Sequence, residues 1–227
     1  MWKNDLVDYR GFRFSKLNTP EYSHLLYLLF WPIYGLMFLT VERLWIRESY
    51  FPISCPLDAY IPFCEFFLIP YMFWFVFLVG IHVYTLFYDV DSFKKLMQFI
   101  ILTYSAPVGL YMIFPNCQEL RPESFARDNM FTRFMAGFYQ FDTNTNVCPS
   151  IHVIGSVAVM VCAWHSKHFS TPLWRTLFTI TAVLISISTV FLKQHSIIDV
   201  AAALPICLIA YLLVYRRGGR RSVAQRQ

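Results

Sequence analysis

Six apolar stretches divide the sequence, and their lengths predict how the chain meets a membrane. A helix needs about 20 mostly apolar residues to cross the hydrocarbon core of a bilayer. The stretches cover residues 25–41, 66–88, 96–114, 152–164, 173–192 and 197–215. The fourth stretch is short because polar residues occupy its beginning, and we assign those residues to a functional site. The pattern predicts an all-α polytopic membrane protein with six transmembrane helices.

The composition strengthens this prediction. Of the 227 residues, 57% are hydrophobic, 19% are aromatic and 15% are charged, whereas a soluble domain usually has about 25% charged residues. No linker-like segment and no internal repeat interrupts the apolar region. We therefore expect one helical membrane domain over residues 23–216, preceded by an N-terminal segment over 1–22 and followed by a basic tail over 217–227.

The N-terminal segment is polar and of mixed charge. Trp2, Phe12 and Phe14 lie beside arginines and lysines, which is typical of a helix in the membrane interface. A loosely ordered tail is the alternative, because chain ends are often poorly ordered.

The positive residues predict the orientation in the membrane. The formal net charge is +5, and with six crossings 13 of the 19 lysines and arginines fall on the side of the two termini. Positive residues are enriched on the cytoplasmic side of membrane proteins, so we expect both termini to be cytoplasmic. The loops at about 42–65, 115–151 and 193–196 then face outward. Because the charge flanks the membrane segments, it does not indicate nucleic-acid binding.

The candidate chemistry lies in two of these outer loops. His195 and Asp199 are four residues apart at the start of the last apolar stretch, so they share one helix face. A carboxylate that binds one imidazole nitrogen fixes the tautomer and leaves the other nitrogen free to attack or to accept a proton. His195 is therefore the candidate nucleophile.

A second histidine follows a predicted helix start at the end of the third loop. The segment 149–152 reads Pro-Ser-Ile-His, and the free N–H groups at a helix start favour an anion such as phosphate. Ser150 would cap this start or donate to the phosphate. His152, one turn in, would protonate the leaving group in a displacement at phosphorus.

These residues resemble the motifs of the type 2 phosphatidic acid phosphatase superfamily. Its members typically carry Lys…Arg-Pro, then Pro-Ser-x-His, then Ser-Arg-x5-His-x3-Asp. Here the matching residues are Arg121-Pro122, the segment 149–152, Ser188, His195 and Asp199. The chain departs from the pattern at Phe114, where lysine is expected, and at Thr189, where arginine is expected. These departures, with Asp142 and the asparagines after it, look more like the sphingolipid-synthase and inositolphosphotransferase-like branch.

The resemblance implies a role for each site residue. His195 would attack phosphorus, Asp199 would orient it, and His152 would act as general acid and then as base. Substrate phosphate would be held by Arg121 and Ser150, with Lys193 in place of the missing positive charge. Lipid headgroup anchoring is the alternative for Arg121 and Lys193. Asp142 would contact the substrate or handle protons, or would only cap the loop.

The sequence leaves the reaction partly open. Water as acceptor would make the chain a phosphatase of phosphatidic acid, an isoprenyl phosphate or a similar lipid, and an alcohol would make it a headgroup transferase. The alternative is a non-catalytic membrane transporter or scaffold of the same fold. The lipid substrate, its acceptor and the oligomeric state are not fixed by the sequence.

No metal or cofactor is expected, because positive side chains and a helix start can neutralise the phosphate. The six cysteines show no zinc-binding spacing. A disulfide between Cys117 and Cys148 is left open, because both are expected on the outer side.

Overall fold

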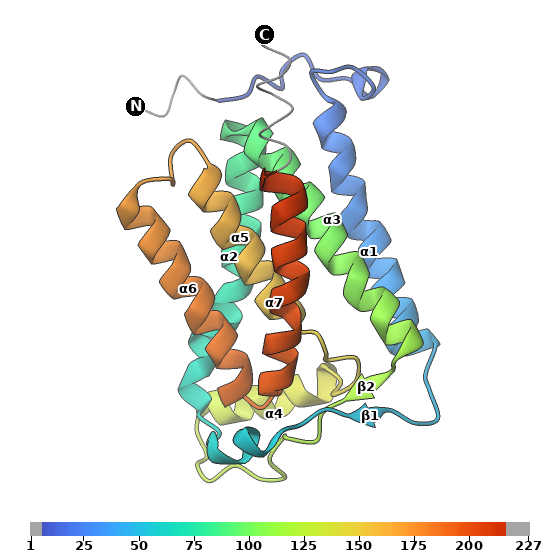
Figure 1. The fold of residues 1–227 in the computed structure, drawn as a ribbon, viewed down its shortest axis with the longest axis vertical. Helices are drawn as coiled ribbons and strands as arrows, with labels where there is room; N and C mark the ends of the chain where they lie inside the picture. Colours follow the sequence, from blue (N-terminus) through green and yellow to red (C-terminus); the bar gives the residue numbers. More distant parts are fainter. Residues whose placement is uncertain (1–5, 217–227) are drawn as a thin grey trace.

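Residues 6–216 of the computed structural model form a bundle of long helices that run side by side (Figure 1). The helices are α1 (Phe30–Leu39), α2 (Leu68–Tyr88), α3 (Val90–Ile113), α4 (Met130–Phe141), α5 (Ile151–His165), α6 (Pro172–Phe191) and α7 (Ile197–Tyr211). Two strands of two residues each, β1 (Phe51–Pro52) and β2 (Asn116–Cys117), pair in parallel within the described range. The predicted all-α class is confirmed.

Five helical segments are long and apolar enough to cross a membrane. They are Ser23–Leu44, Glu65–Tyr88, Val90–Ile113, Pro172–Phe191 and Ile197–Arg216. Their bounds follow the predicted stretches within a few residues, except that α3 begins at Val90 rather than at residue 96. The Asp89 carboxylate accepts hydrogen bonds from the backbone N–H and the hydroxyl of Ser92 at 3.2 and 2.8 Å. This cap lets α3 begin before its apolar part.

The remaining predicted span, α5, is apolar but has only 15 residues. At 1.5 Å per residue it is about 22 Å long, less than the thickness of a bilayer core. It packs against α2, α3, α6 and α7, and its small residues Ala158, Cys162 and Ala163 are buried. Because its neighbours shield α5 from lipid, it does not have to cross the full thickness, and its first turn is free to begin inside the bundle.

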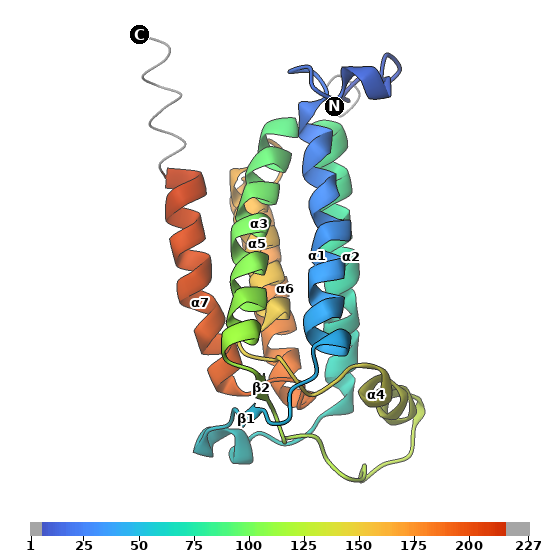
Figure 2. The same ribbon diagram turned by 90° about the vertical axis from the view of Figure 1, so that its right-hand side faces the viewer.

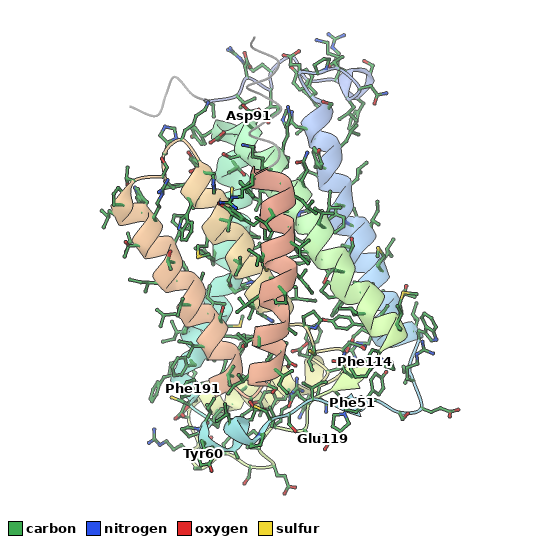
Figure 3. The ribbon with its side chains drawn as sticks, in the orientation of Figure 1. Phe51, Tyr60, Asp91, Phe114, Glu119 and Phe191 are labelled. Carbon is green, nitrogen blue, oxygen red and sulfur yellow. The ribbon has the colours of Figure 1, made fainter. Side chains whose placement is uncertain are left out.

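The two ends of the bundle differ in construction (Figures 1 and 2). Residues 6–22 and the end of the last helical segment lie at one end, and α4, β1 and β2 lie at the other. Asp91 marks the first end, whereas Tyr60 and Glu119 mark the second (Figure 3). The loops predicted to face outward therefore share one end of the molecule.

Helix α4 is an element that the apolar pattern did not predict. The Asn129 side chain caps it by accepting hydrogen bonds from the N–H groups of Phe131 and Thr132. Its buried residue Met135 packs in a cluster with Tyr71 and Leu192. An amphipathic helix of 12 residues lies below the length of a transmembrane helix, which is why the search for spans passed over it.

The N-terminal segment differs from the interfacial helix that its composition suggested. Within residues 6–22 the structure has a short 3-10 turn, Phe14–Lys16, and no α-helix. Gly11 and Pro20 disfavour a continuous helix here. The Tyr9 hydroxyl instead donates to the carbonyl of Leu86 at 2.7 Å and contacts a ring nitrogen of His24 at 2.8 Å. Trp2 and the basic tail at 217–227 lie outside the described residues.

The fold predicts that Ser15 and Glu123, both exposed and at opposite ends of the bundle, face opposite sides of the membrane. In a variant whose loop cysteines are replaced by serine, Ser15→Cys and Glu123→Cys should react with a membrane-impermeant maleimide from opposite sides of sealed vesicles. Labelling of both from the same side would contradict the arrangement.

Candidate active site

A cavity of about 430 Å³ opens among the helices and holds both candidate histidines. Residues of α1, α2, α3, α4 and α5 line it, together with the loop before α5 and the loop before α7. Its polar wall consists of Glu42, Asp142, Thr143, Thr145, Asn146, His152, Gln194 and His195. Most of the remaining wall is aromatic. The two predicted outer-loop motifs therefore meet in one cavity.

His195 is oriented by Asp199. Its Nδ1 lies 3.1 Å from Asp199 Oδ2, and the two residues are 7% and 0% exposed. The same carboxylate oxygen accepts a hydrogen bond from the backbone N–H of Ser196 at 3.0 Å. Because Nδ1 is engaged by Asp199, Nε2 is the nitrogen left for a substrate.

His152 lies next to His195 and is held by aromatic rings. The ring centroids of the two histidines are 5.8 Å apart. His152 stacks on Tyr71, with centroids 4.5 Å apart and planes at 29°, and packs against Trp74 at 4.5 Å. At this separation both imidazoles can contact the same phosphoryl group, as an acid or base and a nucleophile must.

Gly155 makes this packing possible. It lies one turn after His152 on α5, facing α2 and α3. A Cβ at this position would lie 2.6 Å from the Tyr104 hydroxyl and 2.8 Å from Trp74 Nε1, so one of these side chains would have to move in a close-packed interior. The absence of a side chain therefore lets two residues of the cavity wall pack directly on α5.

The loop that carries His195 is fastened to the first outer loop by Asp58. The Asp58 carboxylate accepts hydrogen bonds from the Ser196 hydroxyl at 2.6 Å and from the N–H groups of Ile197 and Cys55 at 2.9 and 2.8 Å. Burial opposes the ionisation of Asp58, but these hydrogen bonds outweigh it and lower its pKa. No local sequence pattern marks Asp58 as part of the site, because its partner Ser196 is 138 residues away.

Lys193 belongs to the same attachment. Its Nζ donates to the backbone carbonyl of Asp58 at 2.8 Å, and its backbone has a positive φ of 53°. Burial lowers the pKa of Lys193, and the charge of Asp58 opposes this shift. Lys193 is not part of the cavity wall. Its predicted role at phosphate stays a prediction, and its observed contact is with the first outer loop.

Arg121 ties the third outer loop to the His195 loop. Its guanidinium donates to the carbonyls of Tyr139, Asp142 and Thr143 and to Gln194 Oε1, at 2.6–3.0 Å. Burial lowers the pKa of Arg121, and the charge of Asp142 opposes this shift. Arg121 lies behind the wall rather than in it, so its phosphate role also stays a prediction.

Ser150 and Asp142 differ in their access to the cavity. Ser150 is fully buried; its hydroxyl oxygen caps α5 by accepting from the N–H of Val153 at 3.5 Å, and its own N–H donates to the Asp199 carbonyl at 3.1 Å. Asp142 lines the cavity and lies 3.8 Å from Arg121. Burial raises the pKa of Asp142, and the charge of Arg121 opposes this shift. Of the four predicted phosphate-binding residues, the cavity wall contains only Asp142.

Glu42 is the wall residue whose absence from the sequence prediction matters most. Its carboxylate accepts hydrogen bonds from Thr145 Oγ1 at 2.8 Å and from Asn146 Nδ2 at 2.9 Å. The sequence did offer a signal, because Glu42 is an acidic residue next to the end of the first apolar stretch. Glu65 is likewise next to the start of the second stretch, but it is not part of the cavity wall. Its carboxylate accepts a hydrogen bond from Asn129 and pairs with Arg127.

Within residues 6–216, no group of three or more His, Cys, Asp or Glu side chains is arranged to hold a metal ion. All six cysteines are free thiols in the structure, including Cys117 and Cys148. Cys148 lies next to the site. Burial, and the negative charge of Asp199, raise the pKa of its thiol to about 12.

Gly155→Ala should destabilise the protein by about 1–3 kcal/mol, because the added methyl group overpacks α5 against Trp74 and Tyr104. Gly109→Ala is the matched control, since nothing lies within 4 Å of a Cβ there, and we expect it to be neutral or stabilising by up to about 1 kcal/mol. Thermal unfolding of the purified proteins in detergent measures both. Equal melting temperatures for the two variants would contradict the packing described.

Because the pKa of the Cys148 thiol is raised, we expect its alkylation rate to keep rising with pH and to reach no plateau below about pH 10. In a variant that retains Cys148 alone, the rate with iodoacetamide should rise about tenfold per pH unit from about pH 7 to about pH 10, because the thiolate is the reactive form. A plateau below about pH 10 would show that Cys148 is not held next to Asp199 in a buried site.

Of three comparisons with known proteins, one gave a match. A comparison with curated proteins gave no match, and a comparison with solved structures gave none either. The family model described as the PAP2 superfamily matches residues 99–222, more than half of the chain. The matched region runs from within α3 past α7 and includes His152, His195 and Asp199. The chain therefore belongs to the PAP2 superfamily, whose members are generally phosphatases.

Proposed function

We propose that this chain transfers a phosphoryl or phospho-headgroup from a membrane lipid to water or to an alcohol. The observation that carries the proposal is the pair of histidines in one cavity, 5.8 Å apart, with Asp199 bound to one of them. A nucleophile, the group that orients it and an acid or base are thus assembled around one space.

The reaction would proceed in two displacements. First, His195 Nε2 attacks phosphorus, the bond from phosphorus to the leaving alcohol oxygen breaks, and His152 donates a proton to that oxygen. In the second step the acceptor oxygen attacks phosphorus, His152 takes its proton, and the bond from phosphorus to His195 breaks. Asp199 stabilises the positive charge that His195 carries between the two steps.

Two features favour an alcohol as the acceptor. Asp142 and the asparagines after it resemble the sphingolipid-synthase branch more than the plain phosphatases, and the cavity wall carries Asp142. The family model identifies the superfamily but not a branch within it, so membership of this branch is a hypothesis. Hydrolysis of phosphatidic acid or an isoprenyl phosphate is the competing reaction.

The site would face away from the cytoplasm. The support is the excess of lysine and arginine at the end of the bundle that carries residues 6–22. Lipid substrate would reach the cavity from the outer leaflet of the membrane.

The proposal is tested by offering the purified protein phosphatidic acid and, separately, a phospholipid with ceramide or diacylglycerol. Release of phosphate would identify a phosphatase, and a new phospholipid without phosphate release would identify a transferase. If the folded protein releases no phosphate and forms no new phospholipid from any of these substrates, the non-catalytic transporter or scaffold would be favoured.

Replacement of either histidine should remove the activity. His195→Ala should lower kcat by at least about 1,000-fold, because loss of a nucleophile disables the whole unit, and His152→Ala by about 100- to 10,000-fold, the usual contribution of a general acid. His165→Ala, at the opposite end of α5, is the matched control and should keep activity within about threefold. Comparable losses in all three variants, at equal thermal stability, would contradict the assignment.

A further inference from the structure

Helix α4 leaves a stripe of apolar side chains uncovered. Met130, Phe134 and Phe141 are 74%, 46% and 76% exposed. Their spacings of four and seven residues place them on one side of the helix, and we call these three residues the apolar side of α4. Large apolar side chains gathered on one exposed surface mark a place where a partner or a membrane makes contact.

The rest of α4 is divided between the bundle and water. Met135 is fully buried and packs with Tyr71 of α2. Arg133 and Ala136 are exposed, and Arg133 forms an ion pair with Asp128 at 2.7 Å. The helix therefore has one side on protein, one polar side and one apolar side. A separate polar side and apolar side are typical of a helix that lies in the membrane interface.

Helix α4 lies at the level where the spans leave the membrane. It runs across the direction of the long helices, and the loop before it extends farther from the bundle than α4 does (Figures 1 and 2). The ring of Phe138 packs on that of Tyr71, with centroids 5.7 Å apart. Tyr71 lies inside the span Glu65–Tyr88, about 9 Å from its start at 1.5 Å per residue. The carbonyl of Phe141 accepts a hydrogen bond from Arg43, next to the end of the first span.

The lipid-facing surface of α2 continues onto α4. Phe66, Ile69 and Phe73 are exposed and share one face of the second span, at spacings of three and four residues. The ring of Phe66 packs on that of Phe131 of α4, with centroids 5.7 Å apart. Because lipid covers the exposed apolar face of a helix that crosses a membrane, the same lipid reaches α4.

We propose that α4 is an interfacial helix that binds the membrane leaflet at the loop end of the bundle. Met130, Phe134 and Phe141 enter the upper part of the acyl chains, about 5–10 Å below the head groups. Arg133 and Ala136 face the aqueous phase. The partner of this surface is the bilayer in which the bundle itself lies, rather than a second protein.

The same helix forms part of the cavity wall. Phe138 and Phe141 line the cavity, and Phe138 packs on Tyr71, which stacks on His152. The leaflet contact therefore holds in place the helix that supports the packing around His152. The inference stands on the surface and the level of α4 and does not depend on the proposed function.

The first test locates two positions of α4 with a nitroxide label. In full-length protein whose loop cysteines are replaced by serine, Phe134→Cys and Ala136→Cys are labelled separately and reconstituted in lipid nanodiscs. The two positions lie about 160° apart around the helix. The label at 134 should be severalfold more accessible to oxygen, which dissolves in lipid, than to a water-soluble nickel complex. The label at 136 should show the reverse preference.

Met130→Cys is the second labelling site on the apolar side, in case Phe134→Cys lowers the melting temperature. A nickel complex that reaches positions 130, 134 and 136 equally would place α4 in water and overturn the inference. Labels at 130 and 134 that neither reagent reaches would show that protein covers the apolar side, which would also overturn it.

The second test uses fluorescence and leaves the cysteines unchanged. The emission added by Phe134→Trp should be quenched by phospholipids brominated on their acyl chains and little affected by aqueous acrylamide. The emission added by Ala136→Trp, the matched control, should respond in the opposite way. Quenching of both by acrylamide alone would contradict a position of α4 in the leaflet.

These outcomes are independent of catalysis. A protein that turns over no lipid, but whose position 134 lies in the acyl chains, would keep the interfacial helix and overturn the proposed function. Activity that depends on His195, in a protein whose position 134 lies in water, would keep the proposed function and overturn the interfacial helix.

Discussion

The geometry of the candidate site depends on one buried carboxylate, Asp58, at the end of the bundle where the outer loops meet. It binds the hydroxyl of Ser196 and the N–H of Ile197, and so fixes the start of α7. His195 and Asp199 are positioned by that start, since one precedes the helix and the other lies in its first turn. In an apolar environment each polar group must find a partner within the protein, and Asp58 supplies such partners to the Ser196 hydroxyl and the Ile197 N–H.

The site is built from both halves of the chain, although the family match covers the second half. The histidines and Asp199 fall within residues 99–222. Their surroundings come from earlier segments: Asp58 holds the loop, Tyr71 and Trp74 pack on His152, and Glu42 lines the same cavity. The groups proposed to react thus lie in the matched region, and groups outside it line the cavity and hold its loops.

The sequence predicted the helices well because their signal is local. Apolar runs of about 20 residues are read directly as spans, and the spacing of His195 and Asp199 on one helix face led to the observed contact. What could not be predicted are contacts between distant loops. Arg121 and Lys193 were assigned to phosphate because they are cations near the motifs, but their hydrogen bonds go to carbonyl groups of neighbouring loops. Glu42 joins Asn146 across 104 residues, and no local pattern contains that pairing.

The most direct test of the account is to trap the covalent intermediate on the protein. A lipid substrate labelled in its phosphate would be mixed with the enzyme, quenched in base within one turnover, and the labelled residue identified by mass spectrometry. The account predicts label on His195 in the unaltered protein and none in His195→Ala. Turnover that proceeds without label on His195, or with label on another residue, would contradict it.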